Sequence, residues 1–597
     1  MRSRSTAPLA PLSATFQRAV DCLQRGELPA AEALCAQILR QQPAHAEALH
    51  VSGLIALQSN KPRKAAELIG KSLAVDPNNA AAHCNRASAL QALQAWDAAL
   101  ESCNAAIVNA PRFAEAYFNR GVVLHRLKRP EEAVASHGRA IELNAQFAQA
   151  YQHRGMILQE LDQPEAALAS YNQAIAVKPD YVEAHLGRGV TLRRLGRPDE
   201  ALLSYDRAIA LNPRHAEAYS NRGNALRELD RWDEALASYD TAIAIRPACA
   251  EAHCNRGNLL NELNRLDAAV ASYDRAIAID SQYVEAYCNR AVAQLLAGDF
   301  EHGWASFEWR RKRQPKRFSQ PPWRGREPLA GKTLLIHSEQ GFGDTLQFCR
   351  YFQPLSTLGA RVIFEVEATL LDLMAGLPGV SQCVAKGAAL PEFDYHCPLM
   401  SLPFAFKTRL DTIPAPAAYL RADAAKVERW RAKLGERTGP RIGLVWSGSA
   451  VRNNNRSIGL ASWMRHLPAG FDYVCLQKEM HADDQALLRE NPRVAVHAAE
   501  LGDFGDTAAL CECMDLVISI DTSVAHLSGA LGRQTWILLP LNPDWRWLLN
   551  RDDSPWYPSA RLYRQRMLGD WNGVLERVGA DLAKAFPSAT PEHGAAP

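Results

Sequence analysis

Apolar and small residues recur at an interval of 34 positions through the first half of the chain. Within the unit from His215 to Pro247, they fall at helical spacing on two successive stretches. The first stretch carries Tyr219, Gly223 and Leu226, and the second carries Ala235, Tyr239 and Ala242. A proline ends this unit and most of the others, because its ring cannot continue the helical hydrogen bonds. The pattern predicts a pair of helices in every unit.

A 34-residue unit built from two helices is the pattern of tetratricopeptide (TPR) repeats. We expect about nine such repeats between residues 12 and 317, with atypical first and last repeats that cap the stack. Repeats of this kind form an all-α superhelix whose concave face binds partners. The first half therefore predicts a surface for a protein or peptide.

Asparagine follows the same period on the first helix of the repeats. The periodic asparagines are Asn85, Asn119, Asn221, Asn255 and Asn289. Asparagine is costly inside a helix, so each position needs an explanation. The amides bind the backbone of an extended peptide in the groove, or they form hydrogen bonds within the repeats. The sequence leaves both explanations open.

Arginine occupies the next position along each of these helices, from Arg86 to Arg290. Its apolar stem can pack where leucine normally lies, while the guanidinium reaches an acidic neighbour. Asp206, Asp240 and Asp274 recur at the same interval. We therefore favour ion pairs inside the solenoid over a carboxylate-binding groove.

Short apolar stretches alternate with helical ones in the second half of the chain. The expected strands are 333–337, 361–366, 442–446, 473–476, 516–520 and 535–539. Short buried strands separated by helices are typical of parallel sheets with helices on both faces. A hinge-like stretch at 420–440 divides the strands into two series. We expect two Rossmann-like α/β domains, at 325–425 and 437–587, with ligands bound beyond the carboxyl ends of their strands.

The composition changes between residues 304 and 328, where the two halves join. Trp304, Phe307 and Trp309 suit a cap on the last repeat. A run of basic residues at 310–317 follows and leads into two prolines. Such a run can bind phosphate, but a solvated linker is the more common explanation. We place the domain boundary here.

Composition removes several classes of function. A net charge of +2 over 597 residues gives no electrostatic case for nucleic acid as a partner. No run of about 18 apolar residues predicts a membrane span. The 13 cysteines are scattered, and their spacing suits neither a metal site nor a disulfide framework. We expect a cytoplasmic protein with reduced thiols and no bound metal.

The first loop with candidate chemistry follows the strand at 333–337. Gly341 and Gly343 let the backbone approach a ligand, and Asp344 lies where the next helix starts. Leu346 occupies the place of the third glycine in a dinucleotide fingerprint, so no nicotinamide cofactor is expected. Asp344 is either a helix cap or a general base at the edge of a cleft.

A second loop follows the strand at 516–520. Asp521, Thr522 and Ser523 open a helix that carries His526. Amide groups, hydroxyls and the helix dipole at this position favour a diphosphate, although an ordinary helix cap uses the same residues.

A third loop follows the strand at 442–446. Ser447 and Gly448 make a turn, and Arg456 lies a few residues further on. An arginine at this place can pair with phosphate.

The stretch from about 331 to 586 resembles bacterial glycosyltransferases of the heptosyltransferase-like group, which have the two-domain B-type fold. The matching motifs lie at 341–344 and 521–526, although Ser523 replaces the glycine usual in that group. The resemblance implies Asp344 as catalytic base, with Arg456 and the second loop on the donor diphosphate. It also implies that Gln477, Lys478 and Glu479 contact the nucleoside.

Tryptophans cluster at 545–556, outside the general pattern of that group. They either stack on a sugar or a base, or pack the edge of the domain.

The layout of the whole chain is similar to that of the protein O-GlcNAc transferases, in which an asparagine ladder in the solenoid holds the acceptor. Together these resemblances imply an inverting, metal-independent glycosyltransferase that needs no cofactor beyond its nucleotide-diphosphate sugar. The acceptor we favour is a protein hydroxyl held by the TPR groove. The alternatives are a TPR scaffold with an inactive transferase-like domain, and a glycosyltransferase with a saccharide acceptor.

Overall fold

The computed structural model describes residues 12–313, 317–448 and 456–587. Contacts divide the chain into two compact units, Met1–Ala248 and Cys249–Pro597. The division falls inside the predicted solenoid, so the last helices of the repeats belong to the second unit. We describe each unit by itself.

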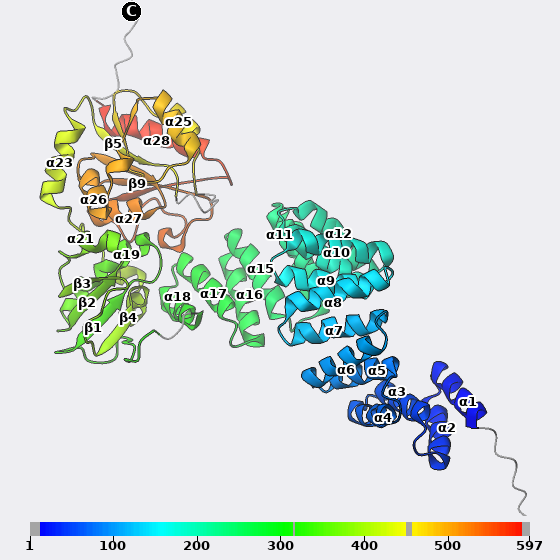
Figure 1. The fold of residues 1–597 in the computed structure, drawn as a ribbon. Coiled ribbons are helices and arrows are strands. Elements are labelled where there is room, and N and C mark those ends of the chain that lie inside the picture. Colours follow the sequence, from blue (N-terminus) through cyan, green and yellow to red (C-terminus); the bar gives the residue numbers. More distant parts are fainter. Residues whose placement is uncertain (1–11, 314–316, 449–455, 588–597) are drawn as a thin grey trace, which may run out of the picture. The chain divides into compact units, whose positions relative to one another are not determined.

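The first unit consists of helices in consecutive antiparallel pairs, as the 34-residue period predicts (Figure 1). These helices are α1 (Leu12–Gln24), α2 (Leu28–Gln41), α3 (Ala46–Gln58), α4 (Pro62–Val75), α5 (Ala80–Ala92), α6 (Trp96–Asn109), α7 (Ala114–Arg126), α8 (Pro130–Leu143), α9 (Ala148–Glu160), α10 (Pro164–Val177), α11 (Val182–Arg194), α12 (Pro198–Leu211), α13 (Ala216–Glu228) and α14 (Trp232–Ile245). In the last three pairs of this unit, a glycine and a tyrosine fix how closely the two helices approach. A Cβ on Gly223 would lie 2.6 Å from the ring of Tyr239, so only glycine fits where α13 crosses α14.

The turn inside each helix pair has a left-handed residue at the same place in every repeat of the described chain. The non-glycine members are Asn60, Gln94, Lys128, Asp162, Asp230 and Asn264, with φ between 55° and 60°. Gly26, Gly196 and Gly298 take the remaining positions. A residue in this conformation ends the first helix and turns the chain back. The repeat length is therefore set by backbone geometry as well as by the core.

The second unit begins with the last repeat helices and continues into the α/β region (Figure 1). These helices are α15 (Ala250–Glu262), α16 (Leu266–Ile279), α17 (Val284–Leu296) and α18 (Phe300–Phe307), followed by the 3₁₀ helix η1 (Glu308–Arg313). Trp304 does more than cap the last repeat, because its ring meets Trp545 edge-on at 5.3 Å and its indole N–H donates to the carbonyl of Thr408 at 3.1 Å. The same hydrophobic core joins α18 to both α/β domains.

The first α/β domain contains a parallel sheet of four strands in the order β3-β2-β1-β4. The strands are β1 (Thr333–His337), β2 (Arg361–Val366), β3 (Gln382–Ala385) and β4 (Tyr395–Pro398). Its helices are α19 (Phe342–Phe348), α20 (Phe352–Ser356), α21 (Leu371–Met374) and α22 (Leu402–Ala405). Leu334 on β1 pairs with Val362 on β2, which sets the register of the centre. The strands β3 and β4 were not predicted, because their polar residues interrupt the apolar runs.

The second α/β domain contains a parallel sheet of six strands in the order β10-β9-β8-β5-β6-β7. The strands are β5 (Arg441–Val445), β6 (Asp472–Cys475), β7 (Val494–Val496), β8 (Leu516–Ile520), β9 (Thr535–Leu539) and β10 (Ala560–Arg564). Its helices are α24 (Leu460–Arg465), α25 (Ala482–Glu490), α26 (Phe504–Glu512), α27 (Ser523–Ala530) and α28 (Asn572–Ala585). In both sheets the strand order reverses beside the first strand, as in Rossmann-like folds. The predicted fold class, a TPR solenoid followed by two parallel-sheet domains, is confirmed.

Several local predictions need correction. The strands at 442–446 and 473–476 each lie one residue earlier than predicted, and β7 and β10 were missed. The stretch at 420–440 is not simply a hinge, because it contains α23 (Ala424–Leu434), which packs against α26. Figure 1 shows the two domains facing each other through α19 and α21 on one side and α26 and α27 on the other.

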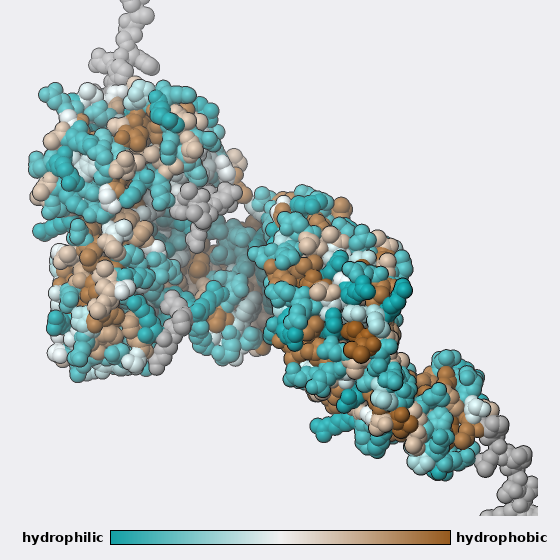
Figure 2. Space-filling model, viewed as in Figure 1, coloured by the Kyte–Doolittle hydropathy of each residue, from teal (hydrophilic) through white to brown (hydrophobic). Residues whose placement is uncertain are grey.

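The visible surface of the α/β region is mostly hydrophilic (Figure 2). Among the described residues, no helix combines the length and the apolar character that a membrane crossing requires. All 13 cysteines are free thiols.

Candidate functional site

The first and second loops of the α/β region, far apart in sequence, lie against each other. Gly341 is the N-cap of α19, and Thr522 is the N-cap of α27. A Cβ on Gly343 would lie 2.9 Å from Cδ2 of His526 and 3.7 Å from the Cα of Ser523. Both loops follow the carboxyl ends of central strands, which is where such sheets bind ligands. We call residues 341–344 and 521–526 the facing loops.

Asp344 has two partners, one within its own loop and one from the other domain. One carboxylate oxygen accepts the Gly341 backbone N–H at 2.9 Å, so Asp344 caps α19. The other oxygen is bound by the guanidinium of Arg546, which follows β9 in the other domain. The Asp344 side chain keeps 15% of its surface exposed. The helix-cap role considered for Asp344 is thus present, together with an ion pair between the domains.

Arg546 is a charged residue at the centre of this site that the sequence argument missed. It also pairs with Asp544 at 2.8 Å and donates to Oε1 of Gln347 at 2.5 Å. Burial alone would lower its pKa, but Asp544 and Asp344 outweigh burial and raise the pKa above the ordinary value. The signal lay in the motif Trp545-Arg546-Trp547, where only the tryptophans were interpreted.

Asp521, the first residue of the second loop, is buried. Its carboxylate pairs with Arg456 at 3.0 Å and lies 3.7 Å from Nε2 of His526. Burial raises the pKa of Asp521 to about 6, and the negative charge of Asp544 acts in the same direction. Arg456 keeps 43% of its side-chain surface exposed, so it can reach a ligand as well as Asp521.

His526 is held as a neutral packing residue. Its Nδ1 hydrogen-bonds the hydroxyl of Tyr557 at 2.9 Å, and its ring stacks on Trp547 at 5.3 Å. Burial lowers the pKa of His526 to about 3. A neutral, enclosed imidazole offers no charge to an anion, whereas Thr522 and Ser523 of the same loop are partly exposed.

Gln477, which follows β6, forms hydrogen bonds with the third loop, which follows β5. The side-chain carbonyl of Gln477 accepts the backbone N–H groups of Trp446 at 2.6 Å and Ser447 at 3.0 Å, and its amide donates to the Ser447 hydroxyl at 2.8 Å. Gln477 and Ser447 are buried, whereas Gly448 is partly exposed. Gln477 therefore fixes the ends of β5 and β6 with the amide that was expected on a nucleoside.

Lys478 and Glu479 follow Gln477 and are exposed to solvent. Lys478 donates to the carbonyl of Gly502 at 3.0 Å. Of the three residues expected on the nucleoside, these two remain accessible.

The tryptophan cluster packs the protein interior. Trp545, Trp547 and Trp556 are 4%, 0% and 0% exposed. Trp556 lies at 5.3 Å from the guanidinium of buried Arg350, and that guanidinium donates to its backbone carbonyl at 2.5 Å. None of the three can stack on a sugar or a base in this structure, so the packing explanation is correct.

The periodic asparagines bond within the repeats in several cases. The Asn85 amide bonds to His50 at 2.9 Å, and Asn119 donates to the thiol of Cys84 at 3.1 Å. In the second unit Asn289 donates to Asn258 at 2.8 Å. Asn255 is also engaged, whereas for Asn221 no hydrogen bond of the amide occurs among the described residues. These contacts favour the structural explanation of the ladder.

The periodic arginines bond mainly to serines sixteen residues later, on the second helix of the same repeat. Arg222 donates to Ser238 at 2.7 Å and also pairs with Asp206 at 2.7 Å. Arg290 likewise pairs with Asp274 at 2.5 Å. The prediction that these arginines form ion pairs inside the solenoid is confirmed at Arg222 and Arg290.

Two arginines of the basic run at the junction are held by carboxylates, so the run is not simply a solvated linker. Arg310 is 7% exposed and pairs with Glu308 at 2.9 Å and Glu339 at 2.7 Å. Arg317 makes a bidentate contact with Glu365, which is 0% exposed, with both distances 2.6 Å. The buried carboxylates of Glu339 and Glu365 thus hold the run against the first α/β domain. Lys316, which belongs to the same run, lies outside the described residues.

Family comparisons match the solenoid. A family described as "Tetratricopeptide repeat" matches residues 50–112, 104–150, 154–216 and 191–248. Two further TPR families match residues 257–298 and 12–37. The fold and these matches define a TPR repeat protein whose repeats are followed by a parallel α/β region.

A curated relative is Protein FlbA of Caulobacter vibrioides, which is 27% identical over 325 residues. The match covers 49% of this chain and 54% of FlbA, so the chain spans about half the length of this relative.

Solved structures also resemble parts of the chain. YrrB, described as a TPR protein with an unusual peptide-binding site, is 26% identical, with 31% of this chain and 96% of YrrB covered and a TM-score of 0.28. TTC0263, a TPR protein of Thermus thermophilus, is 25% identical, with 31% of this chain and 100% of its own covered and a TM-score of 0.27.

Proposed function

We propose that the protein is a glycosyltransferase that moves a sugar from a nucleotide-diphosphate donor to a hydroxyl, with a protein in the TPR groove as acceptor. The observation that carries this proposal is the contact between the facing loops, which belong to two different parallel sheets. Each loop follows the carboxyl end of a strand and opens a helix, and each contributes a carboxylate that is paired with an arginine from another segment. A carboxylate can act as a general base and a helix start can bind phosphate, which are the two roles that this proposal needs.

In this reaction Asp344 acts as the general base. It takes the proton of the acceptor hydroxyl while that oxygen bonds to the anomeric carbon and the bond from the sugar to the diphosphate breaks. The attack comes from the face opposite the leaving group, so the configuration inverts. Arg456 and the start of α27 at Thr522 stabilise the departing diphosphate, because preorganised positive groups lower the energy of the developing charge.

Arg546 has two roles in this proposal. It orients the Asp344 carboxylate, and it adds a permanent positive charge beside the position of the leaving group.

One observation favours the scaffold alternative. In the structure the Asp344 carboxylate is already engaged by Arg546 and by the Gly341 N–H. In a scaffold these contacts would only fasten the domains, and the protein would bind no nucleotide sugar.

The test uses the full chain and a panel of nucleotide-diphosphate sugars. Asp344→Asn should lower nucleoside diphosphate release by at least about a hundredfold, the usual contribution of a general base. The affinity for nucleoside diphosphate, measured by calorimetry, should not weaken, since binding does not need the base. Asp483→Asn is the matched control, because Asp483 is an exposed carboxylate in the first turn of α25.

Two results would reject the proposal. Full turnover of Asp344→Asn would remove Asp344 as the base. Failure of the unaltered chain to bind any member of the panel would favour the scaffold.

A further inference from the structure

A cavity of about 650 Å³ opens at the carboxyl ends of β1 and β4. The order β3-β2-β1-β4 reverses between these two strands. Open α/β sheets bind ligands at such a reversal, and the volume lies in the usual range for small-molecule sites. None of the residues of the facing loops lines this cavity. It is therefore a separate candidate site.

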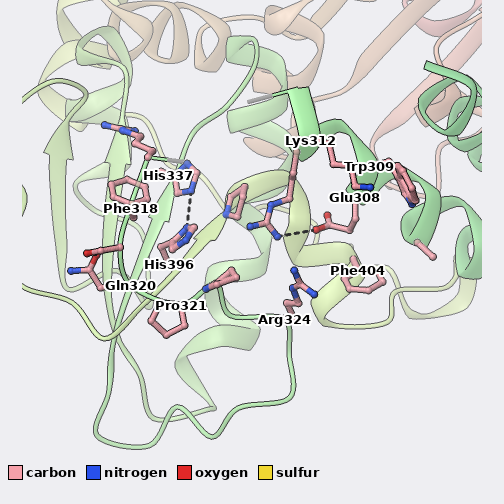
Figure 3. Close-up of a pocket in the computed structure, with 16 residues that line it drawn as sticks. Glu308, Trp309, Lys312, Phe318, Gln320, Pro321, Arg324, His337, His396 and Phe404 are labelled. Atoms are coloured by element: carbon pink, nitrogen blue, oxygen red, sulfur yellow. Dashed lines mark hydrogen bonds and ion pairs between the residues drawn. The ribbon is translucent and has the colours of Figure 1, made fainter. Parts of the chain in front are cut away.

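The wall on the sheet side is a fixed aromatic surface. His337, the last residue of β1, and His396 in β4 lie 3.4 Å apart at their ring nitrogens. The ring of Phe318 lies 5.3 Å from His337 and 5.0 Å from His396. Figure 3 shows these three side chains together on one side of the cavity. Their mutual packing presents flat apolar faces to an occupant.

The opposite wall comes from η1. Trp309 stacks on Tyr287 of α17 at 3.5 Å, and Lys312 lies 3.6 Å above the Trp309 ring. Figure 3 places both across the cavity from the histidines, with Arg324 nearby. The cavity therefore lies between the last repeat and the first α/β domain of the second unit.

The lining carries more positive than negative charge. Four of its side chains are cationic and one is a carboxylate: Arg311, Lys312, Arg317 and Arg324 against Glu308. The carboxylates already balance two of these cations, because Arg311 pairs with Glu308 at 3.4 Å and Arg317 pairs with Glu365 behind the wall.

Within the described residues, neither Lys312 nor Arg324 forms an ion pair with a carboxylate. Lys312 donates to the neutral amide of Gln282 at 2.9 Å. Arg324 is exposed, and neither a hydrogen bond nor an ion pair engages its guanidinium within the described residues. Two uncompensated cations around one cavity favour an anion.

His337 does not add to this charge. Burial lowers the pKa of His337 to about 3, and His396 and Arg317 act in the same direction. The imidazole is neutral near pH 7, so it offers hydrogen bonding and a flat face while Lys312 and Arg324 supply the charge.

We propose that this cavity binds a small molecule that carries an oxyanion, phosphate or carboxylate, on a ring-bearing body. The oxyanion lies between Lys312 and Arg324, and the ring packs against Phe318 and the histidines. This site is additional to the proposed glycosyl transfer and does not depend on it.

The test titrates the full chain with phenyl phosphate, phenylacetate, inorganic phosphate and phenol by calorimetry at low salt. The first two probes separate a phosphate source from a carboxylate source, and phenol lacks the charge. We expect at least one ring-bearing anion to bind more tightly than inorganic phosphate and phenol. Arg324→Gln should lower the affinity for that anion by at least about tenfold, which is the effect of losing one charge-assisted hydrogen bond. Lys312→Gln should act in the same direction.

Two controls separate this site from others. Arg326→Gln removes an exposed cation two residues away that does not line the cavity, and binding should stay within about twofold. Arg456→Gln alters the facing loops and should also leave binding unchanged. The proposal is wrong if neither ring-bearing anion binds, or if phenol binds as tightly as the anions. It is also wrong if Arg324→Gln and Arg326→Gln have the same affinity for the anion, or if Arg456→Gln is the only variant that lowers this affinity.

Discussion

His137 in α8 makes the stability of the solenoid depend on pH. It is 0% exposed, and both ring nitrogens lack a hydrogen-bond partner among the described residues. Its neighbours are aromatic, with Phe118 at 5.4 Å and His153 at 5.6 Å. The equivalent position in the next repeat is Tyr171, which does not titrate near neutral pH. We therefore choose His137→Tyr as the perturbation.

The size of the pH-dependent change in stability follows from the difference in the pKa of His137 between the folded and the unfolded chain. Burial, reinforced by His153, lowers the pKa of His137 from 6.5 to about 3 in the folded state. Below pH 6.5 His137 is protonated in the unfolded chain but stays neutral in the folded chain. The contribution of neutral His137 to stability is therefore complete above pH 6.5 and is lost as the pH falls toward 3. The loss is about 1.4 kcal/mol for each pH unit, or ~2 kcal/mol by pH 5.

The substitution should fit the existing space. A Cβ on Gly121 would lie 2.6 Å from His137, the same approach that Gly223 makes to Tyr239. A tyrosine at 137 therefore meets a glycine placed as in the later repeats. It removes the titration without overpacking the helix pair.

Hydrogen exchange of the α8 amides at pH 7 and pH 5, corrected for the intrinsic rates, measures the local free energy of opening. We expect it to fall by ~2 kcal/mol in the unaltered chain and by much less in His137→Tyr. The reciprocal change Tyr171→His should introduce the same pH dependence in α10. Identical pH dependence in the unaltered chain and His137→Tyr would refute the reasoning.

Two further substitutions test the packing of the second unit by calorimetric melting. Gly343→Ala would place a Cβ 2.9 Å from the stacked His526 ring, so we expect a loss of about 1–3 kcal/mol, whereas Gly341→Ala meets nothing closer than 3.5 Å and is the control. Equal melting temperatures of these two variants would contradict the close approach of the facing loops. Arg317→Gln leaves the fully buried Glu365 carboxylate unpaired and should cost about 3 kcal/mol, most of which Glu365→Gln in the double variant should restore. A double variant no more stable than Arg317→Gln would contradict the pairing.

The periodic parts of the structure could be read from the sequence because each repeat restates the same geometry. Gly223 and Tyr239 recur with a fixed spacing, and so does the left-handed turn residue at positions such as Asp230. Apolar strands such as β1 and β8 were also predictable, since burial on both faces leaves an uninterrupted apolar run. Local rules decide these features, and they need no information from distant residues.

The contacts that build the candidate site lie beyond such rules. Arg546 reaches Asp344 across 202 positions of sequence, and Arg310 reaches Glu339 from the solenoid side of the junction. No spacing pattern links these residues, because the pairings exist only once the two sheets have packed. The same applies to the cavity beside His337, whose walls come from a 3₁₀ helix and two strands.

The charge balance of the facing loops constrains how any anionic donor could bind there. Among the described residues, three carboxylates, those of Asp344, Asp521 and Asp544, pair with two guanidinium groups, those of Arg456 and Arg546. A diphosphate entering this set would face an excess of negative charge unless a carboxylate gave way. Asp521 is the group suited to do so, because burial and Asp544 have already raised its pKa to about 6. With a proton on Asp521, the remaining carboxylates and the two guanidinium groups carry equal and opposite charge, and the half-exposed Arg456 is available to the phosphate. The proposed donor site therefore depends on a buried acid as much as on the helix start beside it.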